Sequence, residues 1–501
     1  MAAPRLLADG CPRAATRAAP TLSREIGLRA QMDSDRYLQT APLRNASLPS
    51  PCPMLYLLVT IIVAIVVTVF AEPTLSIANA SVLVPTGFIC VGIFLWHVRS
   101  ASLGVLRLVF VLLALHVMVG YLIAPSSVPG IVSGTLDDRA FSLSFVVIAS
   151  GLMVASYAFH LSAPSQGWLP CVDTEKLIKV AKWMTVGATL GIFYFYGRNH
   201  LLPWQIDILS MGELRYRISG LDEWLFNRST DILMITVPLL FLFNGAARVF
   251  SLVGLLGLAI TFKRAPILDV VFVAVLANVI RTGKLGKLVL TVGAVFCVYA
   301  ASQLFYHGLL RGDIAPENAY HSVASGLPEV RDLGWILWLN RQDLHWGTTL
   351  VQPLLPIPSF ISPWIQEHGL RGLTTKMIGY DWDEMGGLRI TLAGEGYLNF
   401  GIVGAMALSA LWGCGMRKIS GVIKAAGESG GIVDAYFAAL LVSWMAFWFH
   451  LGGSQASGAV RSGVLLLAAM LYICRPKTLV PDCRGTACRT PLVLPPDCRG
   501  R

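Results

Sequence analysis

The residues whose types and spacing best suit chemistry lie in one short stretch, residues 386–401, with the sequence GGLRITLAGEGYLNFG. It combines Arg389, Glu395 and Asn399 with five glycines, where the chain turns from hydrophilic to apolar. Glu395 and Asn399 are four residues apart, so they share one face of a helix that begins near Gly394. Charged groups at the edge of an apolar segment are costly to keep and are more often functional than those on a soluble surface.

The chemistry that this stretch suits best is general base catalysis by Glu395, because a partly buried carboxylate is a better proton acceptor than an exposed one. His321, His345 and His450 are alternative bases, although a lone histidine on an apolar face, such as His450, is more often structural. A second interpretation stays open: the glycines form a packing seam, and Glu395 pairs with an arginine for structure. The acidic run that precedes the stretch could bind a divalent ion, but it favours a solvated loop turn; its members are Asp381, Asp383 and Glu384.

Arginines form the second candidate group, because their planar guanidinium suits phosphate recognition. Several lie in segments predicted below to be external, where the usual charge bias of membrane proteins disfavours them. The first such segment holds Arg198, Arg215, Arg217 and Arg228, and a tight turn follows at Lys263-Arg264. We expect catalytic roles for Glu395, Arg389 and Arg264, and substrate binding by Arg215, Arg217, Arg331, Tyr397, Asn399 and Arg461.

Composition predicts that these residues belong to a polytopic membrane protein. Of 501 residues, 55% are hydrophobic and 14% are charged, and the mean hydropathy is +0.64. A soluble domain carries about 25% charged residues. In a membrane protein the net charge of +10 indicates positive cytoplasmic loops, so we expect a lipid bilayer and no nucleic acid as partner.

Apolar runs close to the roughly 20 residues that span a bilayer follow one another from Met54 onward. They predict an all-α fold of about twelve transmembrane helices, several of them short. The expected spans are 54–71, 78–97, 103–124, 141–161, 180–196, 229–245, 249–262, 266–280, 286–305, 397–415, 433–450 and 460–474.

Lysines and arginines in alternate short loops predict the orientation, with both ends of the chain in the cytoplasm. Residues 197–228 and 306–396 then form external loops, and the second is long enough to be functional. We expect short helices within it. Its tryptophans either anchor it at the membrane interface or stack on sugar rings; they are Trp335, Trp338, Trp346 and Trp364.

The two ends of the chain carry no motif with chemistry. We predict that residues 1–53 form a disordered cytoplasmic segment, or that the true start of the protein is Met32 or Met54. Residues 54–475 form the membrane domain, and 476–501 a disordered cytoplasmic tail. The ten cysteines include no CxxC pair or Cys/His metal spacing, so neither a disulfide framework nor a zinc site is expected.

Residues 394–401, GEGYLNFG, resemble the G-E-x-Y-x-N-F-G stretch of bacterial oligosaccharide repeat unit polymerases, the Wzy-type O-antigen and exopolysaccharide polymerases. The layout is also similar, with many spans, cytoplasmic ends and one dominant periplasmic loop that contains Arg331-Asp332. An Arg-x10-Gly pattern described for one subgroup does not occur in these loops, so the residue roles of that subgroup are not carried over.

The resemblance implies a C-type glycosyltransferase fold in the bacterial inner membrane that needs no nucleotide sugar, no metal and no other cofactor. Its substrates would be oligosaccharides linked to undecaprenyl diphosphate, joined at the periplasmic face, with a flippase and a chain-length regulator as possible partners. Two alternatives stay open. An O-antigen ligase would transfer the glycan to lipid A core, and a transporter or flippase would show inverted repeats, which the sequence does not display.

Overall fold

A computed structural model describes a large part of the second of two units into which the chain divides, Met1–Leu58 and Val59–Arg501. The described residues are 80–99, 104–123, 136–163, 165, 167–202, 220–261, 264–284, 286, 290, 293–294, 327–339, 344–351, 362–379 and 388–476. The predicted segment 1–53, the span 54–71, most of the span 286–305, the acidic run at Asp381 and nearly all of the tail lie outside them.

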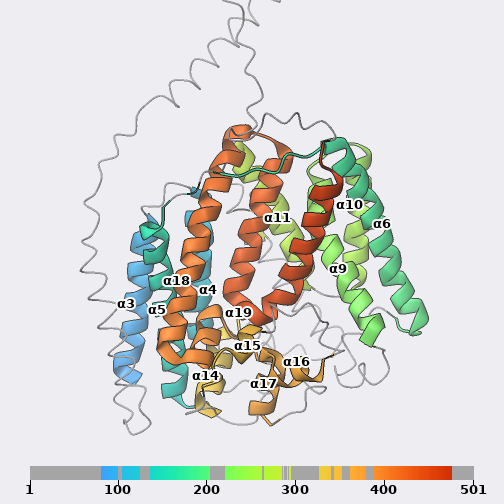
Figure 1. Cartoon of the computed structure of the whole chain (residues 1–501). Helices are drawn as coiled ribbons and strands as arrows, with labels where there is room; N and C mark the ends of the chain where they lie inside the picture. The colour runs from blue at the N-terminus through green and yellow to red at the C-terminus, as the bar shows by residue number, and fades with distance from the viewer. Residues whose placement is uncertain are drawn as a thin grey trace, which may run out of the picture. The chain divides into compact units, whose positions relative to one another are not determined.

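The described residues form helices and no strand (Figure 1). The long helices before the 306–396 segment are α3 (Ala80–Arg99), α4 (Gly104–Ile123), α5 (Asp138–Leu161), α6 (Thr174–Arg198), α9 (Gly220–Phe241), α10 (Ala246–Ile260) and α11 (Arg264–Thr282). Four short helices follow, α14 (Glu329–Leu339), α15 (Thr348–Val351), α16 (Pro363–His368) and α17 (Leu370–Met377), and then α18 (Leu392–Ser429) and α19 (Ile432–Ile473).

The prediction of a helical membrane protein is confirmed at this coarse level. Within the described residues, four segments are long and apolar enough to cross a membrane: Gly104–Leu122, Asp138–Leu161, Leu392–Ser429 and Ile432–His450. The short helices expected within 306–396 are also present. Helix α9 begins at Gly220, so the last part of the predicted 197–228 loop is helical, and its external location stays a prediction.

Helix α5 lies at the centre of the packing, and nearly all of its side chains are buried. It contacts α3, α18 and α14 extensively. Small residues make these approaches possible: a Cβ on Gly413 of α18 would collide with the backbone carbonyl of Ala155, and one on Gly151 would meet Ser409. Glycines that admit close backbone contact are a common device of membrane helix pairs.

Helix α19 doubles back on itself, as Figure 1 shows. Straight, its 42 residues would extend about 63 Å. Instead, a Cβ on Gly463 would meet the Trp444 ring, and Val433 and Met470 line the same small pocket. The two predicted spans 433–450 and 460–474 therefore correspond to two halves of one bent helix.

The helix ends gather at two ends of the bundle. Helices α14–α17 lie together at one, here called the loop end (Figure 1). At the other, the Asp173 N–H donates to the Cys474 carbonyl at 2.8 Å, and the Ser165 hydroxyl donates to the Lys418 carbonyl at 2.7 Å. We call this the basic end, because it carries Lys176, Lys179, Arg417, Lys418 and Lys424. The grouping follows the predicted alternation; which end faces the cytoplasm stays a prediction.

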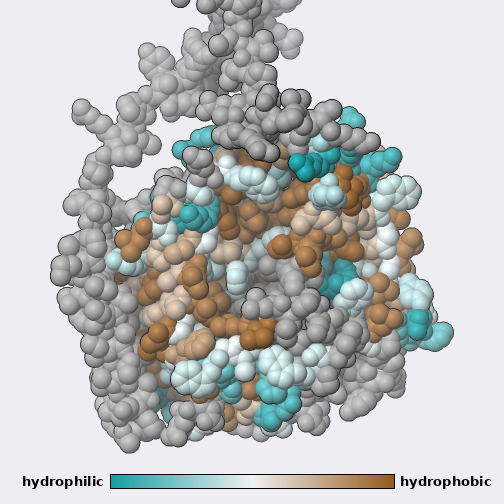
Figure 2. Space-filling model, viewed as in Figure 1, coloured by the Kyte–Doolittle hydropathy of each residue, from teal (hydrophilic) through white to brown (hydrophobic). Residues whose placement is uncertain are grey.

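Apolar side chains also cover much of the outside of the bundle. Trp183 and Leu190 of α6 and Leu252 and Leu256 of α10 are all more than half exposed. Figure 2 shows apolar residues over much of the middle of the viewed face, with hydrophilic residues mainly toward its upper and lower margins. Such a surface suits contact with lipid, where an exposed apolar side chain loses nothing.

Candidate functional site

The GEGYLNFG stretch folds into a short helix that turns sharply back. Thr391 caps its N-terminus, since the Thr391 hydroxyl accepts from the Gly394 N–H at 3.2 Å. Helical geometry ends at Phe400 (φ −138°) and Gly401, whose φ of 64° and ψ of −153° belong to a region open to glycine alone. The predicted helix near Gly394 is thus confirmed, with its start at Leu392.

The reversal at Gly401 brings the short helix against the helix that follows it. A Cβ on Gly396 would collide with the carbonyl of Gly404, and a Cβ on Gly404 with that of Gly396. In a straight helix these residues would be about 12 Å apart. The predicted span 397–415 therefore needs correction: residues 392–401 form a hook, and the long helix begins after it.

Glu395 lies in the helical part of this hook and is buried, with 0% of its surface exposed. The Thr349 hydroxyl donates to Glu395 Oε1 at 3.0 Å. The Asn399 amide donates to Thr349 Oγ1 at 2.7 Å and to the Glu395 carbonyl at 2.8 Å. Glu395 and Asn399 therefore share one helix face, as their spacing predicts, and both contact Thr349.

Asn399 also holds the chain segment that precedes α15. Its backbone carbonyl accepts from the Trp346 N–H at 3.0 Å, and its Oδ1 accepts from the Gly347 N–H at 2.9 Å. Trp346 and Gly347 have positive φ values of 46° and 86°. The polar atoms of Asn399 are thus occupied in fixing this turn over the hook, and its predicted role in substrate binding stays a prediction.

The first turn of α14 lies beside the segment that leads into the hook. Arg331 Nη2 and Nε donate to Asp332 Oδ1 at 2.7 and 2.9 Å, and the Arg389 N–H donates to Asp332 Oδ2 at 2.9 Å. Arg331 is 3% exposed, and its Nη1 has no hydrogen-bond partner among the described residues. Burial raises the pKa of Asp332, and the Arg331 charge and the bond from Arg389 oppose this rise. The side chain of Arg389 is exposed.

The other predicted residues are not gathered here by any described contact. Tyr397 is half-buried and packs on the main hydrophobic core. Arg264 begins α11 and Arg461 lies in α19, but their side chains, like all of Arg215 and Arg217, lie outside what the structure describes. Two further arginines that are predicted to face outward have carboxylate partners, in the pairs Arg198–Asp222 (3.3 Å) and Arg228–Asp231 (2.9 Å).

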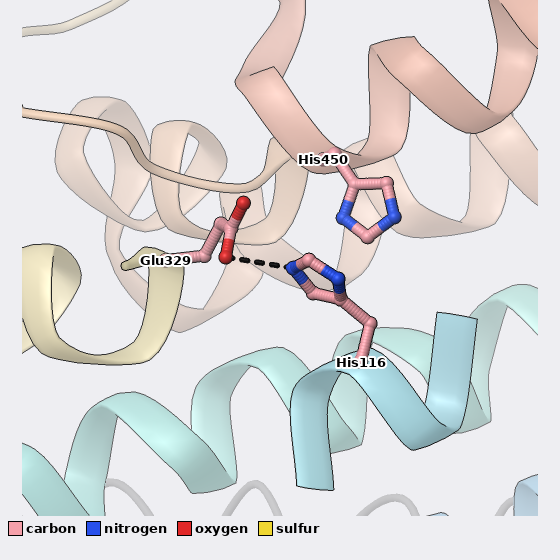
Figure 3. A group of neighbouring side chains, drawn as sticks. All are labelled: His116, Glu329 and His450. Atoms are coloured by element: carbon pink, nitrogen blue, oxygen red, sulfur yellow. Dashed lines mark hydrogen bonds and ion pairs between the residues drawn. The ribbon is translucent and has the colours of Figure 1, made fainter. Parts of the chain in front are cut away.

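A group of three side chains at the loop end was missed by the sequence analysis. His116 of α4, Glu329 of α14 and His450 of α19 point toward one another (Figure 3). His116 Nε2 and Glu329 Oε2 are 2.8 Å apart, and the two imidazole centroids are 4.2 Å apart. Burial acts to raise the pKa of Glu329, but the charge and hydrogen bond of His116 outweigh it and lower this pKa to about 2.

The sequence contained only a weak signal for this group. His450 is an alternative base that lies on an apolar face, where a lone histidine is more often structural, and His116 stands in an equally apolar run. Glu329 is separated from His116 by 213 positions, so no spacing rule connects them. The only signal is that two lone histidines, His116 and His450, stand in different apolar spans, which could place them side by side in the membrane domain.

Known proteins place no further constraint on this site. No protein family, curated protein or solved structure matches the chain.

Proposed function

We propose that the chain is a glycosyltransferase that joins oligosaccharide repeat units carried on a polyprenyl diphosphate lipid at the external face of a bacterial inner membrane. One observation carries the proposal. Glu395, a buried carboxylate, lies on the hook, and Arg389 precedes the hook with an exposed side chain. The backbone N–H of Arg389 donates to Asp332 of the buried Arg331–Asp332 pair. Proton acceptor and phosphate-binding groups thus belong to one connected unit near the edge of a helical bundle.

The reaction needs a leaving group that can accept charge. The bond between the anomeric carbon and the diphosphate oxygen breaks, and the acceptor sugar oxygen bonds to that carbon. The Arg389 side chain is exposed, and Arg331 Nη1 is a donor without a partner in the described structure. Fixed donors aimed at the developing charge stabilise such a transition state. Asp332 positions both arginines, since it bonds the Arg331 side chain and the Arg389 backbone.

The acceptor hydroxyl must lose a proton, and Glu395 is the group proposed to take it. Its Oε1 now accepts from the Thr349 hydroxyl. A sugar hydroxyl that replaced Thr349 Oγ1 at this position would donate to the same carboxylate oxygen. Helix α15, which carries Thr349, is only four residues long, so a small displacement of it would make the exchange possible.

The direct test incubates the purified protein in nanodiscs with lipid-linked repeat units and resolves the products by size. We expect a ladder from the wild type and none from Glu395→Gln, which keeps a hydrogen-bond acceptor for Thr349. Arg389→Ala should slow elongation by roughly 100- to 1,000-fold. Glu428→Gln, an exposed carboxylate of the basic end, is the matched control and should elongate normally.

The same assay separates the alternatives. A wild-type protein that elongates nothing until lipid A core is added would be a ligase, and the polymerase proposal would fail. Normal ladders from Glu395→Gln would remove Glu395 from proton transfer and leave the class of enzyme standing.

A further inference from the structure

We propose that His116, Glu329 and His450 bind a divalent transition metal ion, with Zn²⁺ as the preferred ion. One ligand atom from each residue lies within 4.8 Å of the other two. Two imidazole nitrogens and one carboxylate oxygen are a ligand set that zinc takes in proteins, with a fourth position left for water. This inference does not rest on the proposed function and departs from the expectation of a metal-free protein.

The positions of the three groups are close to those that zinc requires. Zinc–nitrogen and zinc–oxygen bonds of roughly 2.0–2.1 Å in a tetrahedron place neighbouring ligand atoms about 3.3 Å apart. His116 Nε2 and Glu329 Oε2 are already 2.8 Å apart. A metal ion between them would replace this hydrogen bond after a shift of a few tenths of an ångström, and the His450 ring would then move inward.

His450 supplies the second, independent observation. Its Nδ1 is buried and has no hydrogen-bond partner among the described residues. A buried polar atom without a partner is costly and calls for an explanation, such as an ion. The His450 ring lies against the His116 ring at an angle of 58°, which keeps it near the other two ligands.

The backbone is shaped to bring Glu329 to His116. Gly120 lies one helical turn after His116, and a Cβ there would be 3.3 Å from the carbonyl of Leu327. This glycine lets the start of α14 approach α4 closely. The Ser144 hydroxyl of α5 fixes the same turn by donating to the Val330 carbonyl at 2.6 Å. A metal ion would therefore join α14 to α4 and α19.

The experiment measures metal directly and needs no glycan substrate. Full-length protein in detergent is stripped with EDTA, reloaded with Zn²⁺ or Co²⁺, freed of unbound ion by gel filtration, and assayed by elemental analysis. We expect about one ion per chain and, for Co²⁺, the intense visible absorption of a tetrahedral site. Zn²⁺ should also raise the thermal unfolding temperature, because it binds the folded chain.

Variants distinguish this site from adventitious binding. Glu329→Gln and His450→Ala should each weaken Zn²⁺ binding by about tenfold or more, since even the loss of residues that support ligands has that effect. His368→Ala is the control, because His368 is another histidine of the loop end and stacks on Trp364 outside the cluster. Glu329→Gln keeps the shape of the side chain, so a folded variant that lacks the ion remains informative.

Two results would overturn the proposal. One is wild-type protein that retains no more Zn²⁺ than the His116→Ala/His450→Ala double variant. The other is a Co²⁺ spectrum without tetrahedral bands. Failure of glycan elongation with one bound ion per chain would refute the proposed function alone.

Discussion

The two ends of the bundle differ in the charges that they bury, although the loop end also carries one exposed pair, Lys376–Glu367. At the loop end, the Arg331 and Asp332 side chains are 3% and 4% exposed, and that of Glu329 is 7% exposed. At the basic end, the paired side chains of Lys424 and Glu428 are 71% and 68% exposed. Burying a charge is costly unless it is paired, whereas an exposed charge near a membrane costs little.

The difference separates two uses of charged residues in a membrane protein. The Lys424–Glu428 pair of the basic end is solvated and weakly held, as expected of residues that set orientation. The buried charges at the loop end are held in fixed geometry by Asp332, Thr349 and the turn over the hook. Fixed, desolvated groups are what binding and catalysis require. The contrast can be tested by substitutions at both ends.

The largest effect is expected from Asp332→Asn. This change leaves the Arg331 guanidinium buried without a countercharge, and breaking a buried ion pair in this way costs about 3–5 kcal/mol. Denaturant unfolding in mixed micelles should show the loss as a lower free energy of unfolding.

The double variant Arg331→Met/Asp332→Asn is the control for that measurement. It has no uncompensated charge and keeps an acceptor for the Arg389 N–H, so it should recover most of the lost stability. A single variant as stable as the wild type would show that water reaches Arg331, and the contrast between the two ends would be lost.

A medium effect is expected at the reversal of the hook. Gly401→Ala forces an alanine into φ 64°, ψ −153°, which costs roughly 1–3 kcal/mol. The thermal unfolding temperature in detergent should fall accordingly. Gly187→Ala is the matched control, because Gly187 lies within α6 with open space around its would-be Cβ, and this change should leave stability equal or slightly higher. Equal unfolding temperatures for Gly401→Ala and Gly187→Ala would contradict the sharp turn at Gly401.

The smallest effect is expected at the basic end. Lys424→Ala removes an exposed i,i+4 pair with an N···O distance of 3.9 Å, and such pairs contribute less than about 0.5 kcal/mol. The same unfolding measurement should not separate this variant from the wild type. A loss as large as that of Asp332→Asn would show that the two ends do not differ in the way described.

Features carried by neighbouring residues could be predicted from the sequence. Apolar runs located the long helices, the shared face of Glu395 and Asn399 followed from their spacing, and the glycines of 394–404 indicated close packing. Gly396 and Gly404 pack closely, as the packing interpretation of this stretch predicts, whereas a catalytic role for Glu395 stays a prediction.

Features assembled from distant residues could not be predicted. Hydropathy reports how apolar a segment is and not where the chain reverses. The predicted span 397–415 therefore includes the last residues of the hook. The partnership of Thr349 with Glu395 joins residues 46 positions apart, and the His116 cluster joins three helices. Nothing in the local sequence distinguishes a histidine that meets another ionisable group from one that packs alone.

The hook also imposes an order on biogenesis. Its helical part, residues 392–399, would be about 12 Å long and cannot cross a hydrocarbon core of roughly 30 Å as an inserted segment. It also carries a carboxylate, which opposes entry into lipid. Its packing surface includes Gly404, which leaves the ribosome after it. We therefore expect the hook to take its place only after the translocon has released the helix that follows it.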